Sequence, residues 1–163
     1  MTGLRAPRLC WLSWLALPLM GILAQPCWGN PVAPPPELQP LLRALERARY
    51  AVFWAPPPIP GAYGATDVKR RMIWVSPLTI DLGIARQVLL HEAVHAAQGC
   101  PRGRLAPLGW RLQPDPVVER EISGLLYRGY AHSKHEVERE AFFAQGHPKA
   151  MGMVLQALRQ RCR

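Results

Sequence analysis

The chain has 163 residues, of which 49% are apolar and only four are cysteines, and its formal net charge is +9. The length suits one domain, the apolar content excludes a disordered chain, and the few cysteines exclude a small disulfide scaffold. The basic charge permits an anionic partner but identifies none, because net charge governs solubility and association rather than a site.

Residues 1–29 have the pattern of an export signal. Arg5 and Arg8 form a basic start, and the apolar run Leu9–Ala24 follows. This run is short for a membrane span, which needs about 20 residues, so it favours a cleaved signal peptide over an anchor. We therefore expect a secreted or periplasmic protein, which contacts a membrane only if this N-terminal segment stays uncleaved.

The cysteines bear on where the signal ends. Small residues permit cleavage after Ala24 or after Gly29. The first site would leave three cysteines, an odd set for an exported protein, whereas the second leaves Cys100 and Cys162. These two residues are expected to form a disulfide or to remain two unpaired thiols.

Beyond the signal, a Pro-rich spacer over residues 30–36 leads into residues 37–163, which we expect to form one domain. Apolar periodicity predicts helices over 37–50, 79–98, 117–130, 135–145 and 149–161, and strands over 51–54 and 71–75. Proline and glycine predict loops over 56–64 and 100–116. This order indicates an α+β fold, with a small sheet of two or three strands packed on helix 79–98 and further helices C-terminal to it.

Helix 79–98 contains His91-Glu92-Ala93-Val94-His95, an H-E-x-x-H motif. Residues four apart lie on one helix face, so His91 and His95 can bind one metal ion, and zinc is favoured. Glu92 stands beside the ion as general base for a metal-activated water. The apolar flanks argue against two solvated histidines, since ionisable residues on a buried helix need partners.

A catalytic zinc also needs a third protein ligand. The candidates lie at or beyond the end of helix 79–98: Cys100, Glu119, Glu121, His132, His135, Glu136, Glu138, Glu140 and His147. Glu138 and Glu140 flank the inward stripe of helix 135–145 on either side. Periodicity therefore does not choose between them.

The segment Leu90–Gln98, followed downstream by Glu138-Arg-Glu140-Ala141, resembles the gluzincin type of zinc metallopeptidase. The later segment is similar to the E-x-E-A helix of ImmA/IrrE-type peptidases. The resemblance implies a zincin-like minimal domain, with Glu138 as third ligand and Glu140 in reserve. The sequence departs from that pattern at Phe142, where the family commonly has Asn.

The motif and the resemblance together predict a zinc endopeptidase that acts on an exported or envelope protein or peptide. Its oxyanion needs a hydrogen-bond donor besides the metal. Tyr127, Tyr130 and His132 lie between the two ligand helices and are candidates for this donor. Met72–Val75 is either the strand beside which an extended peptide would lie or a core strand.

Two other functions remain open. An inactive zincin-like domain would keep the metal for stability, although Glu92 counts against it, because a structural site needs no base and usually has four protein ligands. A basic module for anionic envelope polymers would rest on the arginines, which are scattered along the sequence, with Arg70-Arg71 and Arg102/Arg104 the closest groupings. No nucleic-acid motif accompanies them, so nucleic acid is not an expected partner.

Overall fold

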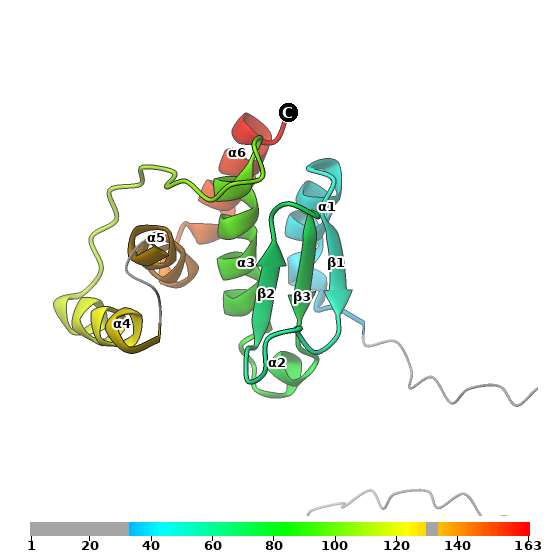
Figure 1. Ribbon diagram of the computed structural model, residues 1–163. Coiled ribbons are helices and arrows are strands. Elements are labelled where there is room, and N and C mark those ends of the chain that lie inside the picture. The colour runs from blue at the N-terminus through cyan, green and yellow to red at the C-terminus, as the bar shows by residue number, and fades with distance from the viewer. Residues whose placement is uncertain (1–32, 130–133) are drawn as a thin grey trace, which may run out of the picture. The chain divides into compact units, whose positions relative to one another are not determined.

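A computed structural model describes residues 33–129 and 134–163 of the chain. The expected signal peptide, both of its cleavage sites and residues 30–32 of the spacer lie outside the described residues. Within the described part, six α-helices and a three-stranded mixed sheet form the α+β fold that the sequence predicts (Figure 1).

The elements follow the predicted order closely. Their bounds are η1 (Pro36–Leu38), α1 (Gln39–Arg47), β1 (Ala51–Trp54), β2 (Gly64–Asp67), β3 (Met72–Val75), α2 (Leu78–Asp81), α3 (Ala85–Gly99), α4 (Pro116–Gly129), α5 (His135–Gly146) and α6 (Ala150–Arg161). No helix among the described residues has the length and apolar character that crossing a bilayer requires.

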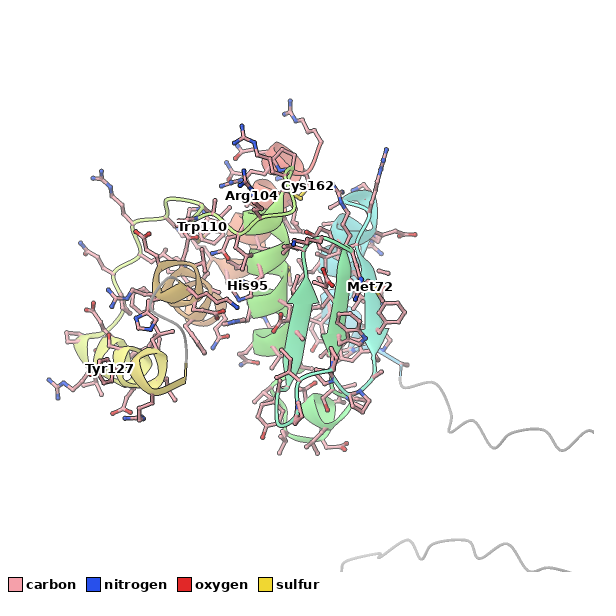
Figure 2. The ribbon with its side chains drawn as sticks, viewed as in Figure 1. Met72, His95, Arg104, Trp110, Tyr127 and Cys162 are labelled. Carbon is pink, nitrogen blue, oxygen red and sulfur yellow. A yellow bond between two sulfur atoms is a disulfide. The ribbon has the colours of Figure 1, made fainter. Side chains whose placement is uncertain are left out.

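The sheet has the order β1-β3-β2, with β1 parallel and β2 antiparallel to β3. Met72–Val75 is therefore the central strand, and Figure 2 marks its first residue. Both of its edges are hydrogen-bonded within the sheet, so the expectation that an extended peptide would lie beside this strand is wrong. The free edge next to the central helix belongs to β2, a strand whose short polar sequence gave no strand pattern.

The predicted helix over 79–98 is two helices. Gly83 has φ +69° and follows the last turn of α2. Its N–H donates to Ile80 O at 3.0 Å, and the Ile84 N–H donates to Thr79 O at 2.9 Å, which is the Schellman pattern. Glycine adopts this left-handed conformation at little cost, so α2 ends here and α3 starts in a new direction.

Helix α3 is the central element. It packs against the sheet through β2 and β3, and against α5 and α6 on its other side (Figure 1). Its small residues Ala93, Ala96 and Ala97 are fully buried, so neighbouring elements approach its backbone closely. The largest fully buried apolar side chains of the core that α3 shares with its neighbours are Leu38, Leu41, Leu45, Ile73, Val75, Leu89, Leu90, Val94 and Val154.

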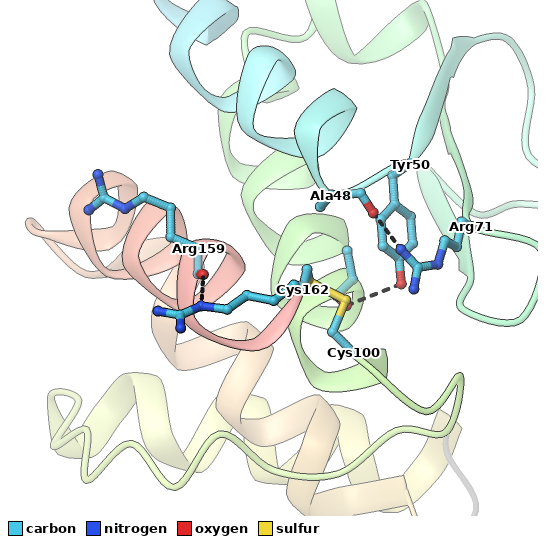
Figure 3. Close-up of a disulfide and its surroundings, with 8 residues drawn as sticks. Ala48, Tyr50, Arg71, Cys100, Arg159 and Cys162 are labelled. Carbon is cyan, nitrogen blue, oxygen red and sulfur yellow. Dashed lines mark hydrogen bonds between the residues drawn. A yellow bond between two sulfur atoms is a disulfide. The ribbon is translucent and has the colours of Figure 1, made fainter.

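A disulfide joins Cys100, just after α3, to Cys162, just after α6 (Figure 3). The two Cα atoms lie 5.0 Å apart, and 62 positions separate the residues in sequence. The expected pairing is thus confirmed, and the alternative of two unpaired thiols is not found. The predicted loop after α3 begins at this bond and runs to the start of α4.

Candidate metal centre

His91, His95 and Glu138 form one buried group between α3 and α5. The two histidines occupy successive turns of α3, and their Nε2 atoms lie 3.1 Å apart. Glu138 Oε2 lies 3.4 Å from His91 Nε2 and 3.3 Å from His95 Nε2. Three ligand atoms of types that bind metal ions therefore converge on one point.

The electrostatics of this group favour a cation. Burial alone would raise the pKa of Glu138, but hydrogen bonds with His91 and His95 and their charges lower that pKa to about 2. Burial alone would likewise lower the pKa of His95, but Glu138, then the charge of Glu92 and the Gln98 hydrogen bond, raise it overall. Glu138 is thus held as a carboxylate whose negative charge can balance a cation, and the donor set fits a metal ion.

Two glutamines hold the outer nitrogens of the ligand histidines. Gln98 Oε1 lies 2.7 Å from His95 Nδ1, and Gln145 Oε1 lies 3.1 Å from His91 Nδ1. An amide oxygen only accepts, so we infer that Nδ1 carries the proton in each ring. The lone pair of each Nε2 then points into the group, which is the tautomer that a metal ligand requires.

Glu140 does not belong to the group, but it contacts Gln98, which in turn contacts His95. Its Oε2 accepts hydrogen bonds from Gln98 Nε2 at 2.8 Å and from the Leu108 N–H at 2.7 Å, and its Oε1 accepts one from the Trp110 N–H at 2.9 Å. Gln98 Nε2 also donates to Val137 O at 2.9 Å. Because Gln98 donates to two acceptors, its oxygen can only face His95. The long loop is thereby connected to a ligand histidine.

Glu92 is buried beside the ligand group on α3. The Thr66 hydroxyl on β2 donates to Glu92 Oε2 at 2.7 Å. The other carboxylate oxygen lies against Gly64, where an added Cβ would come within 2.5 Å of it. The start of β2 therefore fixes the carboxylate from two sides, and only glycine fits there without displacing it.

A cleft of about 510 Å³ opens next to this carboxylate. His91 and Glu92 line it from α3, Phe142 and Gln145 from α5, and the segment Gly61–Gly64 from the approach to β2. The ring of Phe142 stands edge-on to His91 with centroids 4.6 Å apart. The aromatic residue that departs from the resembled pattern thus packs against a ligand histidine.

The predicted oxyanion donors do not reach this site in the described residues. Tyr127 is 85% exposed and lies on α4 away from His95 (Figure 2), so the expectation that it donates to an oxyanion is wrong. Tyr130 and His132 lie outside the described residues.

The remaining third-ligand candidates stand apart from the group. Cys100 is held in the disulfide, and His147 Nδ1 accepts the Lys149 N–H at 3.1 Å. The others, apart from His132, are Glu119, Glu121, His135 and Glu136, and none of them belongs to the metal-ligating cluster.

Sequence reasoning missed Gln98, Gln145, Thr66 and Gly64. Gln98 had a signal, because it lies three residues after His95 and so on the same face of α3. Gln145 had a similar signal, because it lies seven residues, or about two helical turns, after Glu138 and so on the same face of α5. Thr66 and Gly64 had none, since only the folded sheet brings β2 to α3.

Comparison of the chain with family models, with curated protein sequences and with solved structures gives no match.

Proposed function

We propose that this protein is a zinc-dependent peptidase in which His91, His95 and Glu138 hold the ion and Glu92 is the general base. The observation that carries the proposal is the position of Glu92. It is buried beside the ligand group, held by Thr66, and lines an open cleft. A metal kept only for stability needs neither a base nor an open cleft beside it.

Zinc suits this donor set, because two imidazoles and one carboxylate are a common catalytic combination that leaves a coordination position open. When bound, zinc supplies a Lewis acid and brings the pKa of a coordinated water to about 7. Gln98 and Gln145 orient the two imidazoles, and Glu138 contributes the negative charge that balances the cation.

In the proposed reaction Glu92 accepts a proton from the attacking water and passes it to the leaving amine. The Thr66 hydroxyl occupies Glu92 Oε2 and restricts the carboxylate to one orientation. General-base catalysis of this kind contributes about 10²–10⁴-fold to a rate. The Phe142 ring stands edge-on to His91 on the side of α5, where both residues line the cleft.

An extended peptide is the substrate class that the cleft and the sheet favour. Among residues 33–129 and 134–163, β2 pairs with β3 on one side and with no strand on the other, so its outer edge is open to a further strand. The segment Gly61–Gly64, which leads into β2, lines the cleft with Glu92. A peptide that added a strand to β2 would bring its backbone past that carboxylate. With the expected export signal, the substrates would be exported or envelope proteins.

The test compares wild-type protein with Glu92→Gln on a library of quenched fluorescent peptides, with zinc measured by elemental analysis. We expect one zinc per chain in both proteins, and a loss of hydrolysis of at least about a hundredfold in the variant. Glu119→Gln, an exposed change of the same charge on α4, is the matched control and should retain full activity. A wild-type protein that binds zinc but cleaves no peptide would instead support the inactive, structural-metal alternative.

A further inference from the structure

A basic hollow lies at the C-terminal end of α3, beyond the metal centre. Its volume is about 450 Å³, and its cationic lining comes from two separate stretches of sequence: Lys69 and Arg71 in the β2–β3 turn, and Arg102 and Arg104 in the loop after α3. The loop folds back onto the turn, so that a Cβ at Gly103 would lie 3.7 Å from the Lys69 Cα. Arginines that are scattered in sequence thus converge in space.

The cations of the basic hollow lack carboxylate partners. In the part of the chain that the structure describes, the one ion pair at this turn joins Arg70 to Asp67 at 3.7 Å. Arg71 donates to Ala48 O at 2.7 Å, which is a neutral acceptor. Lys69, Arg102 and Arg104 are exposed.

Like charges that line one hollow repel one another, and physiological salt screens exposed charges over about 8 Å. The C-terminal end of α3 offsets only about half a charge. Four cationic side chains therefore line the basic hollow, with Asp67 nearby paired to Arg70, and a bound anion would balance part of their charge.

The positive surface continues onto the end of α6. The disulfide holds Cys162 against Cys100, so α6 ends beside the start of the loop (Figure 3). Arg161 donates to Pro107 O at 3.2 Å, and Arg163 Nε donates to Arg159 O at 3.4 Å. Figure 2 shows Arg104 and Cys162 at the same end of the molecule. The loop that supplies Arg102 and Arg104 thus also contacts a cation of α6.

We propose that the basic hollow binds an extended polymer that bears phosphate groups, at a site separate from the metal centre. Phosphate suits these residues, because arginine binds its oxygens through paired N–H groups and lysine binds it as a point charge. A polymer suits the extent of the surface, which runs from the β2–β3 turn across the loop towards α6. The polar, exposed lining does not suit an apolar ligand. This site would anchor the protein to an anionic polymer while the cleft stays free.

The test measures binding of fluorescently labelled linear polyphosphate to the full protein over a range of salt concentrations. We compare wild-type protein with the triple variant Lys69→Ala/Arg102→Ala/Arg104→Ala. Arg71 is left in place, because its bond to Ala48 O ties β3 to the end of α1. We expect the variant to bind at least about tenfold more weakly. We also expect the magnitude of the slope of log affinity against log salt concentration to fall by about two, because the variant lacks three cations and about 0.7 of a counterion is released per neutralised phosphate.

The matched control is Arg120→Ala/Arg128→Ala/Lys134→Ala, which removes the same number and kinds of exposed cations from α4 and the residue before α5. We expect it to bind like wild type. Equal loss in both variants, or no loss in the first, would overturn the proposal, because binding would then follow net charge alone. If inorganic phosphate at an equal concentration of phosphate groups displaced all of the polyphosphate, the proposal that the ligand is a polymer would be overturned. Equal melting temperatures for the three proteins would show that each is folded. If a triple variant has a lower melting temperature, the same positions are changed to Gln instead of Ala and the binding is measured again.

Discussion

The middle and the C-terminal end of α3 differ in how their charged groups are stabilised. Towards its middle, at His91 and His95, charged and polar groups are buried and each has a partner within hydrogen-bond distance. At its C-terminal end three of the four cations are exposed, and none of the four has a carboxylate partner among the described residues. An unpaired polar group that is buried raises the free energy of the folded state, so the groups of the metal centre are held in a specific geometry. Solvent weakens the repulsion between exposed charges, so the cations of the basic hollow can lie together at a modest cost in free energy. Substitutions should therefore have large, sharply localised effects at the first region and additive, salt-dependent ones at the second.

The largest effect is expected where the ligand group itself is broken. Among the described residues, Glu138 has the only carboxylate within 4 Å of both histidines, so Glu138→Ala should lower the zinc content to near zero. Glu140→Ala should keep nearly one zinc per chain but lower the free energy of unfolding. The Leu108 and Trp110 N–H groups would lose their acceptor, and each unpaired N–H group costs about 1–3 kcal/mol of stability. Elemental analysis and urea unfolding measure the two quantities. Full zinc in Glu138→Ala would show that the third ligand has been misassigned.

Breaking the disulfide should weaken the whole domain and leave zinc binding intact. Cys100→Ser/Cys162→Ser removes a link between residues 62 positions apart, and the loop-entropy model gives a loss of about 4 kcal/mol. Thermal unfolding with and without a reductant measures this loss. Addition of reductant should change the melting temperature of wild type but not that of the variant, and equal changes in both would contradict the prediction.

A change at Gln98, which contacts His95, should have an intermediate effect on metal affinity. Gln98→Leu leaves His95 Nδ1, Val137 O and one Glu140 contact without a partner, and such outer groups typically change metal affinity by about 10–100-fold. Competition with a chromogenic chelator measures the affinity.

Gln145→Leu is the matched control on the other histidine. Because Gln145 is half-buried, water can replace it at His91 Nδ1, and we expect a smaller loss. A larger loss from Gln145→Leu than from Gln98→Leu would contradict this reasoning.

The smallest of these effects is expected at Gly64. Gly64→Ala places a methyl group 2.5 Å from Glu92 Oε1 and 2.8 Å from Val88 Cγ1, so the carboxylate must move. We expect hydrolysis to fall severalfold with zinc content unchanged, and stability to fall by about 1–3 kcal/mol. Gly152→Ala, in α6 with nothing within 4 Å of the new methyl, is the control and should gain stability.

Helices were predictable because their signals are local. The apolar period gave the α5 bounds to within a residue, and the H-E-x-x-H spacing fixed the two histidines on one face of α3. The ends were less accurate where a single residue decides them, as at Gly83. The choice between Glu138 and Glu140 could not come from periodicity, because both are buried and differ only in which neighbour they face.

Features that depend on tertiary contacts were not predictable. β2 has the sequence Gly-Ala-Thr-Asp, and it forms a strand because β3 lies beside it. Its contribution to the site, through Thr66, exists only after the chain has folded back over α3. The basic hollow has the same origin, since its two stretches lie about thirty positions apart in sequence.

The disulfide and the contacts of Glu140 anchor the first half of the loop after α3, and residues 111–115, in which exposed and half-buried side chains alternate, follow these anchors. A protease that cut there would produce two fragments, one with His91 and His95 and the other with Glu138. The bond between Cys100 and Cys162 would hold these fragments together, so they would migrate as one species until reduced. A nicked chain would therefore keep its ligand set in a single covalent molecule under oxidising conditions.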